Sequence, residues 1–172
     1  MLTLHTLIEG AALHDGELVL PFHLREKSRL RASLRSGEEV AVLRPRGTVL
    51  RGGDLLQGGD GQVVRIVRIA AEPEAVYRIT HADTSALVRC AFHLGNRHTQ
   101  AQVGPGWLRI RADPVLGEML AGLGAQVSTE LAPFEPEAGA YGGGHRHGDA
   151  HAAHPLAPIP ARQKIYRATG RA

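Results

Sequence analysis

Short runs of β-branched and aliphatic residues, separated by glycine-containing turns, fill the first 71 residues. The turn signals are Asp15-Gly16, Ser36-Gly37, Arg46-Gly47, Gly52-Gly53-Asp54 and Gly58-Gly59-Asp60-Gly61. The runs with strand-like composition are residues 17–22, 39–43, 48–50 and 62–69. Turns at this spacing with β-branched runs between them are typical of sandwiches and half-barrels, and no helical period competes with this interpretation. The pattern therefore predicts a small all-β domain over residues 1–72.

The periodicity changes after Glu72-Pro73-Glu74, where proline cannot donate to a sheet ladder. A strand is expected at residues 76–80, and a helix capped by Asp83 or Thr84 should follow it. The apolar positions of that helix recur at helical spacing: Leu87, Cys90, Ala91 and Leu94. The change from strand to helical periodicity predicts a second domain with mixed structure.

Two further strands, at residues 99–103 and 107–111, precede a second helix that begins at Asp113-Pro114, an N-cap followed by proline. Its expected apolar face is Val115, Leu116, Met119, Leu120 and Leu123, and glycines at 122 and 124 end it. A last strand is expected at residues 125–131. The order β-α-β-β-α-β predicts a ferredoxin-like domain over residues 75–141, so the chain is expected to be α+β.

The tail, residues 142–172, is dominated by Gly, His, Ala and Pro, with too little apolar surface to offset its ordering entropy, so we expect it to be disordered. It carries four histidines within ten residues: His145, His147, His151 and His154. Imidazole suits nickel, zinc and copper, and a flexible tail can wrap an ion without a preformed cage. These four residues are candidate metal ligands.

His98 lies four residues after Leu94, so by spacing it continues the apolar stripe of the first helix. If that face packs against a second subunit, the two His98 imidazoles could hold one divalent ion across a two-fold axis. The alternative is an ordinary histidine whose ring bonds a backbone carbonyl. The remaining histidines, among them His5, His14, His23 and His81, are assigned to surface or core.

Composition excludes several classes of function. Cys90 is the only cysteine, so a thiolate cluster within one subunit is impossible, and we expect a small buried side chain. The net charge is +3, and the basic segment Arg25, Arg29, Arg31 and Arg35 has few aromatics near it, which favours a solvated surface over nucleic-acid binding. The sequence shows no signal peptide, membrane span or catalytic motif, so a cytoplasmic protein that is not an enzyme is expected.

Six stretches, in this order and spacing, resemble the UreE family of urease accessory proteins. They are Arg25-Glu26-Lys27-Ser28-Arg29, Leu43-Arg44-Pro45-Arg46-Gly47-Thr48-Val49-Leu50, Gly53-Asp54-Leu55-Leu56, His93 to His98, Val115-Leu116-Gly117-Glu118-Met119-Leu120 and Pro133 to Tyr141. The resemblance implies a peptide-binding-like first domain, a dimerising metal-binding second domain and a nickel chaperone, with His98 as the nickel ligand between subunits. Zinc is a second candidate metal. It also implies, as partners, the urease-activating GTPase UreG and the activation complex on apo-urease.

One departure concerns Pro114, which stands where many members of the family have a histidine. Proline has no ligand atom, so we expect His145 and His147 to contribute more to the metal site. Three other functions remain open: a general nickel or zinc buffer without a dedicated client, a nucleic-acid-binding module and a metalloenzyme.

Overall fold

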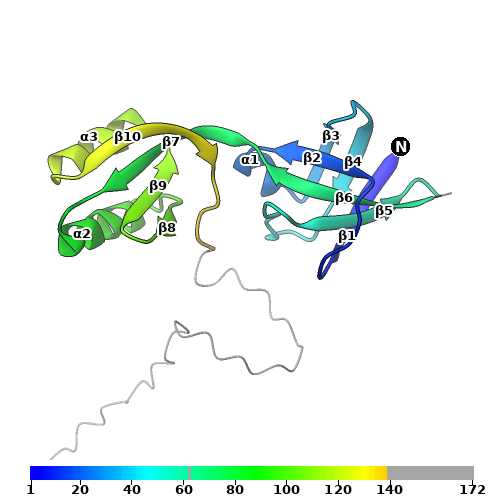
Figure 1. The fold of residues 1–172 in the computed structure, drawn as a ribbon, viewed down its shortest axis with the longest axis horizontal. Helices are drawn as coiled ribbons and strands as arrows, with labels where there is room; N and C mark the ends of the chain where they lie inside the picture. The colour runs from blue at the N-terminus through cyan, green and yellow to red at the C-terminus, as the bar shows by residue number, and fades with distance from the viewer. Residues whose placement is uncertain (62, 139–172) are drawn as a thin grey trace, which may run out of the picture. The chain divides into compact units, whose positions relative to one another are not determined.

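The computed structural model describes residues 1–61 and 63–138. The predicted tail over residues 142–172, with His145, His147, His151 and His154, lies outside the described residues. Ten strands and three helices are found in the described part, and the strands form two sheets (Figure 1). No helix in residues 1–61 and 63–138 has the length and apolar character needed to cross a membrane.

The first sheet has six strands in the order β2-β6-β5-β1-β4-β3. Their bounds are β1 (Leu2–Ile8), β2 (Gly16–Leu20), β3 (Arg29–Ser33), β4 (Glu39–Leu43), β5 (Leu55–Gly59) and β6 (Val64–Ala71). The pairs β1–β4 and β2–β6 are parallel, and the others are antiparallel. Alternate aliphatic side chains, such as Val40 and Val42 on β4, are buried in one apolar core. The prediction of a strand-rich first region is correct, apart from a one-turn helix, α1 (Phe22–Arg25).

Three local predictions in this region are wrong. The strand predicted at residues 17–22 ends at Leu20, because Pro21 cannot donate to the ladder and α1 begins directly after it. Residues 48–50 are not a strand: the Leu50 N–H donates to the carbonyl of Arg25, at 3.0 Å, instead of to a neighbouring strand. Strand β5 was missed because its glycines indicated a turn.

Gly58 explains why a glycine is required inside β5. A Cβ built on Gly58 would overlap the carbonyl oxygen of Thr3 on β1, so only glycine permits this close approach of two backbones. The register of β1 against β5 shifts between Leu4 and Thr6, which is a bulge at His5.

The second sheet has four antiparallel strands in the order β10-β7-β9-β8. Its elements are β7 (Pro73–Thr80), α2 (Thr84–Gly95), β8 (Gln102–Gly104), β9 (Trp107–Arg111), α3 (Pro114–Gly122) and β10 (Gln126–Pro133). Ile79, Leu108 and Ile110 of the sheet share one apolar cluster with Leu94 of α2 and Leu120 of α3. Both helices therefore cover the same face of this sheet.

The helix starts agree with the sequence, since the carboxylates of Asp83 and Asp113 cap α2 and α3. Cys90 is fully buried in α2, as predicted, and this burial raises the pKa of its thiol. Val115 was expected on the apolar face of α3, but its side chain is 75% exposed. Because Leu116, Met119 and Leu123 already form the inward stripe with Leu120, Val115 in the first turn points to solvent.

Arg25 corrects the prediction that the whole basic segment is a solvated surface. Its side chain is 0% exposed, whereas Arg29, Arg31 and Arg35 are exposed. The guanidinium donates to the carbonyls of Leu20, Leu50 and Phe134 and to Oε1 of Glu135, the last at 2.6 Å. Four acceptors satisfy a buried charge that burial alone would strongly disfavour.

Candidate metal site

Helix α2 ends in a hydrogen-bond pattern that places His98 in an unusual backbone conformation. The His98 N–H donates to the carbonyl of Gly95 at 2.9 Å, and the Thr99 N–H donates to that of Leu94 at 3.1 Å. This pair of bonds is the Schellman motif, in which the residue after the helix adopts a left-handed conformation and is usually glycine. Here His98 occupies that position with a φ of 52°.

The expectation that His98 continues the apolar stripe of α2 is wrong. The helix ends at Gly95, and the left-handed turn takes His98 off the face that carries Leu87 and Leu94. The His98 side chain is exposed, and within the described residues its ring makes no hydrogen bond. The alternative of a ring bonded to a backbone carbonyl is therefore not observed among the described residues.

A polar cavity of about 590 Å³ lies beside His98. It is formed by the connection between α2 and β8 and by the junction of β9 with α3. The lining residues are Arg97, His98, Thr99, Gln100, Arg111, Ala112, Asp113 and Leu116. The cavity brings two arginines and one carboxylate next to the candidate ligand.

Sequence reasoning did not find this cavity. Asp113 was recognised only as a helix cap, and Arg97 and Arg111 were not singled out. The hydrophobic pattern that located β9 and α3 does not reveal that the β9–α3 junction lies against the end of α2. The available signal was that Arg111 lies only two residues before Asp113, the N-cap of the second helix.

Helix α2 carries two large apolar side chains that are exposed to solvent. Val88 and Phe92, one helical turn apart, are 62% and 63% exposed. The ring of His93 packs edge-to-face on Phe92, with centroids 5.6 Å apart, and His93 does not line the cavity. In residues 1–61 and 63–138, no group of three or more His, Cys, Asp or Glu side chains could hold a metal ion.

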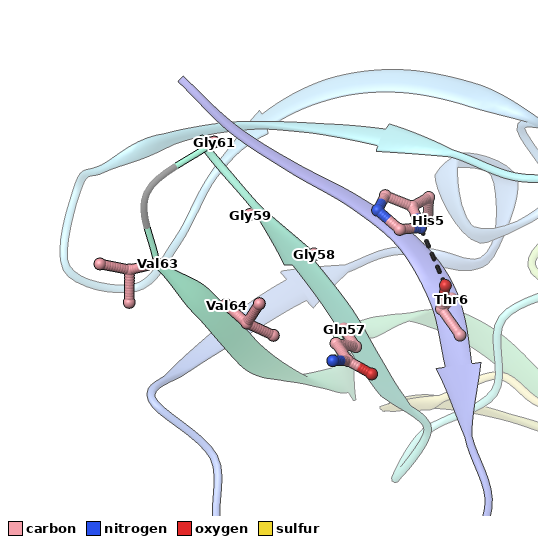
Figure 2. A pocket seen from close by; sticks show the side chains of 8 residues that line it. All are labelled: His5, Thr6, Gln57, Gly58, Gly59, Gly61, Val63 and Val64. Atoms are coloured by element: carbon pink, nitrogen blue, oxygen red, sulfur yellow. Dashed lines mark hydrogen bonds between the residues drawn. The ribbon is translucent and has the colours of Figure 1, made fainter.

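A second cavity, of about 410 Å³, lies on the first sheet (Figure 2). His5 lines it, with Nδ1 2.8 Å from Oγ1 of Thr6, opposite the glycines of β5. His5, His14 and His23 are exposed and His81 is half-buried, with Nδ1 accepting from the N–H of Asp83. None of these four joins His98 in its cavity.

The fold and the site together define a two-domain α+β protein that presents an exposed imidazole, that of His98, just beyond the end of α2. The family profile described as "UreE urease accessory protein, N-terminal domain" matches residues 3–69, and the corresponding C-terminal domain profile matches residues 74–157. The chain belongs to the UreE urease accessory protein family.

Individual relatives agree over nearly the whole chain. A urease accessory protein UreE of Janthinobacterium sp. (strain Marseille) is 62% identical over 172 residues, covering 100% of this chain and 99% of its own. One of Nitrosospira multiformis is 62% identical, covering 97% and 96%. One of Ralstonia nicotianae is 55% identical over 163 residues, covering 95% and 75%.

Proposed function

We propose that this protein is a cytoplasmic nickel-binding metallochaperone that donates Ni(II) during assembly of the urease active site. The proposal rests on one observation above others: an exposed imidazole, that of His98, in a backbone conformation that glycine usually occupies. Membership of a urease accessory family supports urease as the protein that receives the metal. Zn(II) is a second candidate metal.

The proposed site is shared between two subunits. One imidazole is too few ligands for a stable divalent site, which needs about four donors. A homodimer would bring two His98 side chains to one ion, and the exposed apolar pair Val88 and Phe92 offers area for such a contact. Tail residues His145, His147, His151 and His154 would add ligands, since a tethered ligand has a high local concentration.

The second domain, which we place at residues 75–141, is proposed to be ferredoxin-like. The strand order β10-β7-β9-β8 and the element order β-α-β-β-α-β support this assignment. Residues 1–72 form the proposed peptide-binding-like domain, and residues 142–172 the proposed disordered tail. The partners proposed from the family are the GTPase UreG and the urease activation complex. We propose no nucleic-acid or membrane partner and no catalytic reaction by the chain itself.

The test is nickel titration calorimetry with mass measurement by light scattering. The samples are the full chain, His98→Ala, His93→Ala as a matched control in the last turn of α2, and a chain ended after Gly144. We expect His98→Ala to lose the tightest site, His93→Ala to keep it, and truncation to remove further ions. If His98→Ala binds nickel like the full chain, the protein is better described as a metal buffer that binds through its tail.

The consequence of Pro114 is tested separately. Since proline supplies no ligand, His145 and His147 should complete the shell around the paired His98 side chains. Replacing both by alanine is expected to weaken nickel binding by the dimer. Unchanged stoichiometry and affinity in that double variant would rule out their contribution.

A further inference from the structure

The cavity beside His98 carries more positive than negative charge. Two of its lining residues, Arg97 and Arg111, are cations, and Asp113 is its one carboxylate. Asp113 is already engaged, because its Oδ1 accepts from the N–H of Leu116, at 3.0 Å, as the cap of α3. A metal cation would therefore approach His98 against a local excess of positive charge.

The two guanidinium groups are poorly paired. The Arg97 guanidinium donates only to the carbonyl of His93, at 3.3 Å, and the Arg111 side chain makes no hydrogen bond or ion pair among the described residues. Arg109, two residues before Arg111 on β9, differs: it lies 2.9 Å from Glu130 and stacks on Trp107. The strand therefore pairs one arginine internally and leaves the other available in the cavity.

The start of α3 adds no free anion site beside the arginines. Pro114 has no N–H, and the Asp113 carboxylate already caps the helix. Guanidinium groups bind carboxylates through paired, charge-assisted hydrogen bonds. Arg97 and Arg111 in one polar cavity thus fit an anion with two or more carboxylates.

We propose that this cavity binds a small dicarboxylate or tricarboxylate anion that serves as a co-ligand of the nickel held by His98. One carboxylate would pair with Arg97 and Arg111, and another would be free to coordinate the metal. The anion would offset the positive charge that otherwise opposes a divalent cation here. This inference rests on the proposed nickel function and adds the chemical class of a second ligand.

The test uses malonate as the probe. Malonate is titrated by calorimetry into the nickel-loaded full chain, into the double variant Arg97→Gln/Arg111→Gln, and into Arg89→Gln as a control. Arg89 is exposed on α2 and does not line the cavity. We expect malonate binding about 10-fold weaker or more in the double variant, because charge-assisted hydrogen bonds are lost, and unchanged binding in the control.

The nickel affinity of the double variant is a second readout, and it should change in the opposite direction to the malonate affinity. In a non-coordinating buffer without malonate, the double variant should bind nickel about 3-fold more tightly or better, because two positive charges near the ion are removed. Equal malonate affinity in the double variant and the control would overturn the proposal. So would weaker nickel binding by the double variant in that buffer, since the arginines would then support the metal site directly.

Two further measurements distinguish failure of the anion proposal from failure of the nickel proposal. They also distinguish a small anion from the carboxylates of the tail. If the metal-free chain binds malonate and the double variant does not, the anion cavity stands even when His98→Ala binds nickel normally. A chain ended after Gly144 is expected to bind malonate as the full chain does. Much tighter malonate binding by the shortened chain would mean that tail carboxylates occupy the cavity, and it would overturn the assignment to a small anion.

Discussion

Helices α2 and α3 end with the same hydrogen bonds but with different residues at the critical position. At the end of α3, Gly124 donates to Ala121 at 2.9 Å and Ala125 donates to Leu120 at 3.1 Å, which repeats the pattern at the end of α2. Gly124 has a φ of 85°, and His98 has a φ of 52°. The same left-handed turn is thus built once with glycine and once with histidine.

Gly124 meets only the conformational requirement of this turn, whereas His98 adds a side chain that the turn does not need. Glycine enters the left-handed region without steric cost, whereas a residue with a Cβ is disfavoured by about 1–2 kcal/mol. The His98 ring is exposed and makes no hydrogen bond among the described residues that would offset this cost. Backbone strain of this kind is found at functional sites, and it supports a functional role for the imidazole instead of a role in stabilising the fold.

The largest effect is expected for His98→Gly, which makes the end of α2 like that of α3. Nickel affinity should fall about 100-fold or more, roughly 3 kcal/mol, with the loss of the imidazole. The free energy of unfolding should instead rise by about 0.5 kcal/mol, because the left-handed strain is relieved. Calorimetry and urea denaturation measure the two quantities. A variant that loses both binding and stability would show that His98 is structural.

The reverse change, Gly124→Ala, should destabilise the protein by about 1–2 kcal/mol. The cost is conformational rather than steric, because the new Cβ would lie at an ordinary contact distance, 3.4 Å, from Nε2 of His81. Nickel binding should be unchanged, since Gly124 does not line the cavity at His98. A neutral result in urea denaturation would remove the energetic basis for the comparison of the two helix ends.

The helix starts should behave alike, in contrast to the helix ends. Asp83→Ala removes bonds to the N–H groups of Ser85 and Ala86, and Asp113→Ala removes one to Leu116. Each is expected to lower the free energy of unfolding by about 1 kcal/mol, the usual value of an N-cap. Asp83→Ala should have the larger effect. Denaturation of the two variants side by side would expose a reversed order.

The smallest effect concerns Cys90 and pH. Burial raises the pKa of its thiol, so the folded state holds this proton to higher pH than the unfolded chain does. The associated stability is therefore present below the ordinary pKa of 9.0 and is lost as pH rises above it. In Cys90→Ala, the decline of stability between about pH 8 and 10 should be slightly shallower, and nickel affinity should not change. An identical decline in both proteins would contradict this.

Periodicity in the sequence located the second sheet and both of its helices, because Leu87, Cys90 and Leu94 are spaced as a buried helix face requires. Local chemistry also identified Asp83 and Asp113 as caps. The glycine-rich strand β5 was not predictable, since the reason for Gly58 is the backbone of Thr3, far away in sequence.

The candidate site was predicted only in part. The sequence indicated His98 as a ligand, but spacing placed it on a helix face that ends three residues earlier, at Gly95. Turn geometry after a helix depends on which residue takes the left-handed conformation, and histidine gives little signal for that. Arg111 could not be assigned to the cavity either, because its position follows from how β9 meets α3.

The buried Arg25 has a consequence for protein synthesis. Its carboxylate partner, Glu135, is 110 residues further along the chain. A ribosome therefore completes the first sheet well before it supplies the acceptor that neutralises this cation. Until Phe134 and Glu135 emerge, the guanidinium at the end of α1 lacks its carboxylate partner. The segment directly after β10, which ends at Pro133, therefore supplies the last contacts that stabilise the first domain.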